Sequence, residues 1–118
     1  MKKIAIIAQN KYLIEAFHYL GTASENIEVL IKNDYNDSHS DLPPDIDFVF
    51  IDVNSFIEPA IQKTIEIKSY NKNITIFAIC DKYDKFIENK FISAGVEKMI
   101  EKNIINAEII NKLVNKSY

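Results

Sequence analysis

The sequence has few of the residues that build common ligand sites. Its 118 residues include only two glycines, Gly21 and Gly95. A phosphate-binding loop or a dinucleotide-binding turn needs several glycines close together, so neither is expected. The segment 8–12, Ala-Gln-Asn-Lys-Tyr, is also not the Ser-, Thr- and Gly-rich loop that would hold a flavin. No nucleophilic triad can be assembled, which leaves a small enzyme or cofactor binder as the least favoured reading.

Other shortages exclude further classes. Cys80 is the only cysteine, so no disulfide or cysteine metal cluster is expected, and a reduced, cytoplasmic setting fits. No apolar run approaches the ~20 residues of a membrane span. The apolar run at 4–8 after Met1-Lys2-Lys3 is too short for a signal peptide and favours a strand. A net charge of −3 argues against nucleic-acid or membrane partners.

The chain alternates apolar segments with helical patterns. A hydrophobic content of 47% is ordinary for a single globular domain spanning 1–118. Apolar runs predict strands at 4–8, 27–31, 47–52, 74–80 and 96–101. The strand at 47–52 follows Pro43-Pro44, has no polar break from Phe48 to Ile51, and ends on Asp52. It is therefore expected to be the central, fully buried strand.

Four helices are predicted between and after these strands. Asn10, Asp84 and Asn106 are expected N-caps, Pro59 suits a first turn, and Gly21 and Gly95 are expected helix ends. The polar segment 32–45 is expected to hold at most one short helix. The residues expected on the buried helix faces are Leu13, Ile14, Phe17 and Leu20; Ile61, Ile65 and Tyr70; Phe86, Ile87, Phe91 and Ala94; and Ile109, Ile110, Leu113 and Val114.

This alternation predicts an α/β fold with a doubly wound, parallel, five-stranded sheet. Right-handed crossovers favour the flavodoxin-like (βα)5 arrangement with strand order 2-1-3-4-5 and a short or degenerate second helix. The carboxyl ends of parallel strands meet at one edge of the sheet. The candidate site there consists of Ala8, Gln9, Asn10, Asp52, Asn54, Cys80, Asp81 and Lys102.

At these positions the chain resembles the receiver (CheY-like) domain of response regulators from bacterial two-component systems. The resemblance covers the whole chain. Asp52 stands at the place of the phospho-accepting aspartate, and Lys102 at the place of the family's lysine. Ser93-Ala94-Gly95-Val96 resembles the family's Ala-Gly stretch, and Cys80 stands where receivers carry Thr or Ser. The resemblance implies a phosphorelay module rather than an enzyme.

Several positions depart from the receiver pattern. Receivers bind Mg²⁺ through an acidic pair after the first strand, the aspartate and a backbone carbonyl, which Asn54 would offer here. Ala8 and Gln9 replace the acidic pair, so Mg²⁺ is expected only if the pocket still works. Cys80 is a weak hydrogen-bond donor, and Met99 replaces the aromatic switch residue. The pattern resembles an atypical, or pseudo-receiver, variant.

Two hypotheses about the pocket follow. In the first, Asp52 and Lys102 form a structural ion pair, Gln9 and Asn10 line the pocket, and the module acts by protein–protein interaction. In the second, Asp52 is a working phosphoacceptor. In the family the usual docking or dimer surface is built from the fourth helix, fifth strand and fifth helix, which corresponds here to 84–116. A histidine kinase, a downstream signalling protein or a second copy is the expected partner.

Overall fold

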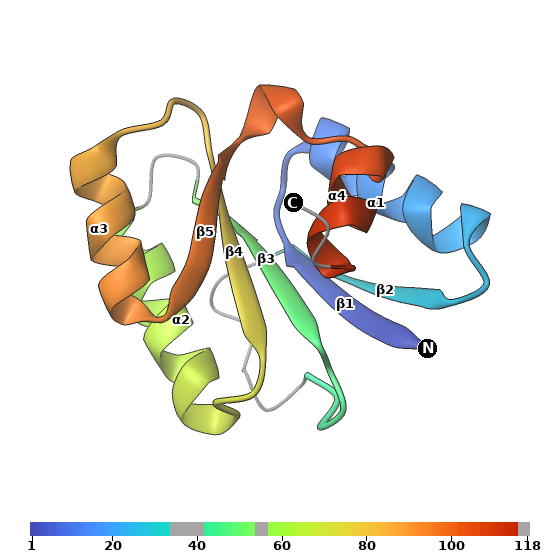
Figure 1. Cartoon of the computed structure of the whole chain (residues 1–118), viewed down its shortest axis with the longest axis horizontal. Helices are drawn as coiled ribbons and strands as arrows, with labels where there is room; N and C mark the ends of the chain where they lie inside the picture. The colour runs from blue at the N-terminus through green and yellow to red at the C-terminus, as the bar shows by residue number, and fades with distance from the viewer. Residues whose placement is uncertain (34–41, 54–56, 116–118) are drawn as a thin grey trace.

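A computed structural model describes residues 1–33, 42–53 and 57–115. Five parallel strands form one sheet in the order β2-β1-β3-β4-β5, which confirms the predicted topology (Figure 1). Their bounds are Lys2–Ile7 for β1, Ile27–Lys32 for β2, Phe48–Asp52 for β3, Thr75–Cys80 for β4 and Val96–Glu101 for β5. All five residues of β3 are buried, as expected for a central strand without a polar break.

Helices cover both faces of this sheet. They are α1 (Lys11–Ala23), α2 (Ile57–Tyr70), α3 (Lys85–Ala94) and α4 (Ala107–Val114), with a short 3-10 turn, η2, at Lys102–Ile104. Helices α1 and α4 share one buried cluster with the sheet, and α2 and α3 share the other (Figure 1). On the first face the Phe50 ring lies between Phe17 and Phe77, with centroids 4.9 and 5.0 Å away.

The predicted N-caps are all present. The side chains of Asn10, Asp84 and Asn106 accept hydrogen bonds from the backbone N–H groups of the third residue of their helices. Gly95 ends α3 with a φ of 119°, a left-handed conformation that favours glycine. Pro59 lies in the first turn of α2. These local signals mark where α1, α3 and α4 begin and where α3 ends.

Gly21 does not end the first helix, contrary to the prediction. Helix α1 continues to Ala23, and the N–H of Ser24 donates to the carbonyl of Leu20. A β-carbon at Gly21 would lie 3.2 Å from Cγ2 of Val29. Gly21 therefore allows the helix to pass close to β2.

The predicted buried faces of α2 and α3 are partly wrong. In α2, Ile65 and Tyr70 are exposed, and Ile61 is half-buried. The residues of α2 that are buried are Ala60, Lys63, Thr64 and Ile67. In α3, Phe91 is fully buried, but Phe86 is 69% exposed and its ring lies beneath the ammonium of Lys90, 5.1 Å away. The buried face of α2 is therefore not its most apolar side.

Between β2 and β3 the described residues 42–47 contain no helix. The rest of the segment expected to hold a short second helix lies outside the described residues. Within the part of the chain that the structure covers, no helix is both long and apolar enough to cross a bilayer.

Candidate functional site

Asp52 lies at the carboxyl end of the central strand. Asp52 is only 3% exposed, and it pairs with Ile79 of β4 in the strand register. The backbone N–H of Val53 donates to the carbonyl of Ile79, which extends the pairing one residue beyond β3. Asp52 is thus fixed at the edge of the sheet where ligands bind in open α/β folds.

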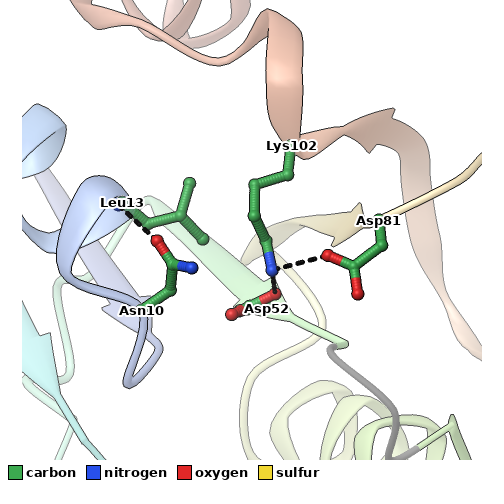
Figure 2. A network of polar contacts seen from close by, with 5 residues as sticks. All are labelled: Asn10, Leu13, Asp52, Asp81 and Lys102. Carbon is green, nitrogen blue, oxygen red and sulfur yellow. Dashed lines mark hydrogen bonds and ion pairs between the residues drawn. The ribbon is translucent and has the colours of Figure 1, made fainter.

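Lys102 reaches this carboxylate from the end of β5. It opens the η2 turn, and its Nζ lies 3.2 Å from Oδ1 of Asp52 (Figure 2). Its side chain is 16% exposed, and that of Asp52 is 4% exposed. The structure therefore brings together the two residues predicted to form an ion pair.

A second carboxylate shares the same ammonium. Nζ of Lys102 donates to Oδ1 of Asp81 over 2.8 Å, and Asp81 follows directly after β4 (Figure 2). The Asp81 side chain is 62% exposed. Sequence reasoning placed Asp81 at the strand ends but did not predict its pairing with Lys102. Its signal was its position next to Cys80 at the carboxyl end of a strand adjacent to β3.

The environment of Lys102 keeps this side chain protonated. Burial acts to lower the pKa of Lys102, but the hydrogen bond that Lys102 donates to Asp81 and the charge of Asp52 outweigh it, so the pKa lies above the usual lysine value. Lys102 is thus a fixed positive charge between two carboxylates.

The other residues predicted to line the pocket do not all lie beside Asp52. Asn10 caps α1, with Oδ1 accepting from the N–H of Leu13 over 3.1 Å, and its side chain lies on the Asp52 side of that helix start (Figure 2). Gln9 is exposed to solvent. Asn54 lies outside the described residues.

Cys80 and Met99 belong to the core beneath α2 and α3. They are 6% and 3% exposed and lie in the same buried cluster. Burial raises the pKa of the Cys80 thiol, and the nearby charge of Glu101 adds to this effect. Cys80 is therefore a protonated, buried thiol.

The residues at this edge do not fit a Mg²⁺ site of the receiver type. Mg²⁺ prefers oxygen ligands, mainly carboxylates and waters. At the end of β1 the chain offers the buried methyl group of Ala8 and the exposed amide of Gln9. The ammonium of Lys102 already lies within ion-pair distance of both Asp52 and Asp81. No group of three potential ligands from His, Cys, Asp and Glu occurs among the described residues.

A separate, largely apolar groove of about 480 Å³ lies between β5 and α4. We call it the β5–α4 groove. Its apolar lining comes from Met99, Ile100, Ile104, Ile109 and Leu113. Lys98, Lys112 and Tyr83 also contribute to its wall. Apart from Tyr83, the residues that line the groove belong to the 84–116 region predicted as a docking surface.

Known structures share this fold closely. A response regulator from Thermotoga maritima has a TM-score of 0.85 and 16% identity, over 98% of this chain and 96% of that one. The BeF3-activated receiver domain of DrrB has a TM-score of 0.82 and 19% identity, over 98% and 96%. A CheY-like receiver domain protein from Methanospirillum hungatei has a TM-score of 0.81 and 11% identity, over 99% and 93%.

These similarities establish the flavodoxin-like fold that response regulator receiver domains have. No protein-family model matches the sequence, and no curated protein matches it. Function must therefore be argued from the site.

Proposed function

We propose that this chain is a receiver-like signalling module that binds other proteins and in which Lys102 holds the aspartate pocket in a fixed, unphosphorylated form. The observation that carries this proposal is the sharing of one lysine ammonium by Asp52 and Asp81, at 3.2 and 2.8 Å. The likeness to solved receiver domains supports the two-component class. The module has no enzymatic activity and no resident cofactor in this proposal.

The physical argument against phosphorylation of Asp52 is that the pocket offers too little positive charge to neutralise a phosphoryl group. Phosphoryl transfer to a carboxylate depends on cations that offset the charge of the incoming group. Here Lys102 is committed to two carboxylates, and Ala8 and Gln9 supply no anionic ligand for a metal ion. A phosphoryl group at Asp52 would thus add negative charge beside Asp81, where the Lys102 ammonium already offsets two carboxylates.

Labelling with a small phosphodonor tests the pocket. The protein is incubated with acetyl phosphate and Mg²⁺, and intact mass is measured for the natural chain and for Asp52→Asn. The proposal expects no phosphoryl adduct that depends on Asp52. An adduct present in the natural chain and lost in Asp52→Asn would contradict it. Amide NMR with beryllofluoride and Mg²⁺ checks the same point without covalent chemistry, and chemical shifts at Asp52 are expected to stay unchanged.

A working phosphoacceptor is the second candidate function. The observation that favours it is the position of Asp52 at the carboxyl end of β3 with Lys102 3.2 Å away. This candidate requires the Lys102 ammonium to leave Asp81 and follow the phosphoryl oxygens. The labelling experiment separates the two candidates.

The β5–α4 groove is the proposed partner surface. It offers an apolar floor from β5 and α4, with Lys98 and Lys112 in its wall. Its chemistry suits a partner segment with apolar side chains flanked by acidic residues, on a histidine kinase or a downstream signalling protein. Alanine substitutions at Lys98 and Lys112 in the groove wall, and at Lys85 elsewhere in the 84–116 region, are expected to weaken binding of such a partner. Unchanged binding in all three variants would place the surface elsewhere.

A further inference from the structure

Strand β2 is an edge strand of the described sheet. It pairs with β1 from Lys2↔Ile27 to Ile7↔Lys32, and no described strand lies beyond it. In Figure 1 it lies along the side of the sheet opposite β5. An edge strand carries a row of backbone donors and acceptors that can pair with another chain.

The direction of these backbone groups follows from the hydrogen bonds to β1. The carbonyls of Asn26 and Lys32 accept from the N–H groups of Lys2 and Ala8, so these residues face β1. Successive residues of a strand direct their backbone groups to opposite edges. Ile27, Val29 and Ile31 therefore direct their N–H and C=O groups away from the sheet, where a further strand could pair with them.

The side chains of β2 are arranged symmetrically about Leu30. Val29 and Ile31 flank it, are half-buried, and pack on the α1 face. Leu30 packs on the opposite face, which it shares with Glu28 and Lys32 because side chains alternate along a strand. One acidic and one basic residue thus lie at equal distances on either side of Leu30.

We propose that two copies of this chain associate through their β2 strands, paired antiparallel with Leu30 on the twofold axis. In this register Val29 of one copy is opposite Ile31 of the other, and these are the residues with outward backbone groups. Glu28 is opposite Lys32 of the other copy, and this happens twice per dimer. The two sheets join into one continuous sheet with both α1 helices on the same face.

A groove on the α1 side leaves room for this contact. It has a volume of about 570 Å³ and is lined by Ile27, Val29 and Ile31 from the strand and by His18 and Thr22 from α1. The Val29 and Ile31 side chains of the second copy enter along this side. The half-buried apolar residues of β2 then lose their remaining exposure to water.

The other edge of the sheet does not have this self-complementarity. In β5 a twofold at Met99 would place Glu97 opposite Glu101 of the other copy, two like charges. Lys98 cannot pair with either glutamate in such an arrangement, because residues separated by an odd number lie on opposite faces. The charge pattern therefore selects β2 over β5 as the edge for self-association.

Sedimentation velocity of the full chain, from micromolar to the highest soluble concentration, measures self-association directly. Glu28→Lys and Lys32→Glu each replace both cross-strand pairs by like charges and are expected to weaken it roughly tenfold or more. An equimolar mixture of the two variants restores opposite charges across the interface and is expected to form a heterodimer. The double variant Glu28→Lys/Lys32→Glu is expected to dimerise like the natural chain.

A natural chain that stays monomeric throughout would overturn the proposal. A dimer that ignores both charge changes would also overturn it and would point to another face, such as the β5–α4 groove. Ile31→Pro is a second, independent variant. It removes an outward N–H without removing a bond to β1, so it should abolish dimerisation while circular dichroism stays unchanged. None of these changes alters Asp52, Lys102 or a residue of the β5–α4 groove, so the result is independent of the proposed function.

Discussion

The ammonium of Lys102 lies 3.2 Å from the carboxylate of Asp52, although Asp52 ends β3 and Lys102 follows β5, with β4 between these two strands. Both side chains are largely buried. Removing one partner of a buried ion pair destabilises the fold, because the other charge stays buried without compensation. This relationship yields the first two predictions.

Removing Lys102 should destabilise the fold. Lys102→Met leaves the buried Asp52 carboxylate without this ion pair, at an expected cost of about 3 kcal/mol in the free energy of unfolding. In the double variant with Asp52→Asn, much of this cost should disappear. Urea unfolding at neutral pH measures the stability of Lys102→Met, of Asp52→Asn and of the double variant. The matched control is Asp81→Asn, expected within about 0.5 kcal/mol of the natural chain because that carboxylate is mostly exposed. Additive costs would contradict a coupled pair.

The contribution of Lys102 should disappear at alkaline pH. Its two carboxylate partners raise its pKa above the usual value despite burial. A lysine with a raised folded pKa stabilises the fold fully below its unfolded pKa, about 10.4, and loses this as pH rises through the folded pKa. The difference in unfolding free energy between the natural chain and Lys102→Met should therefore be constant from neutral pH to about 9 and shrink above about 10.4.

Taking this difference removes other groups that titrate in the same range. Lys3 and Tyr83 have raised pKa values and are present in both proteins, as is the Cys80 thiol. A difference that stayed constant or grew at alkaline pH would refute the assignment to Lys102.

Restoring carboxylates at the end of β1 should create metal affinity. Ala8 follows Ile7, which pairs with Ile51, so its side chain position is level with Asp52. Ala8→Asp with Gln9→Asp is expected to bring two carboxylates to Asp52 and to give Mg²⁺-dependent amide shifts in NMR. Adding Asp52→Asn should weaken the response. If the two-aspartate variant is folded but insensitive to millimolar Mg²⁺, the absence of the acidic pair does not explain the pocket.

Gly95 should tolerate substitution poorly. Its φ of 119° disfavours any other residue, and a β-carbon there would lie 2.8 Å from Cγ of Lys68. The Lys68 chain has little freedom to yield, because its Nζ donates to the carbonyl of Ile74 over 2.6 Å. Gly95→Ala is expected to cost about 1 to 2 kcal/mol in thermal or urea unfolding.

Gly21→Ala is the matched control for that substitution. Alanine favours a helix interior by about 1 kcal/mol over glycine, and the half-buried Val29 can shift to accommodate it. The variant is expected within about 0.5 kcal/mol of the natural chain. Equal losses of stability in Gly95→Ala and Gly21→Ala would contradict the idea that the left-handed backbone of Gly95 makes its substitution costly.

Two phenylalanines of α3 should differ sharply. Phe91 is fully buried, and Phe91→Ala is expected to cost about 3 to 5 kcal/mol. Phe86 is 69% exposed, and Phe86→Ala is expected within about 0.5 kcal/mol. Urea unfolding of the two variants checks this directly. A large loss from Phe86→Ala would mean that the helix is rotated from the orientation described here.

The sheet could be predicted because its signals are local. Unbroken apolar runs such as Phe48–Ile51 have few alternatives to a buried strand, and Asn10, Asp84 and Asn106 act within one helical turn. The Asp52–Lys102 pair could also be predicted, because both residues follow strands of the same parallel sheet.

The helix faces could not be predicted in the same way. In α2, Ile61 and Ile65 suggested one face, whereas the buried residues include Ala60, Thr64 and Ile67. Thr64 can be buried because its hydroxyl donates a hydrogen bond to the carbonyl of Ala60. The pairing of Asp81 with Lys102 was not predicted. It depends on the register between β4 and β5, in which Cys80 stands beside Glu101, and this register cannot be read from the sequence.

The N-terminal strand is tied to the last helix. Nζ of Lys2 donates to the carbonyl of Val114 over 2.6 Å and also bonds to Asn115. The core beneath α2 and α3 is complete once Met99 is present, but the core beneath α1 needs Ile110, Leu113 and Val114. On a nascent chain leaving the ribosome, α1 alone therefore covers this side of the sheet until α4 emerges. Protease resistance of ribosome-bound chains is expected to appear only when α4 has cleared the exit tunnel.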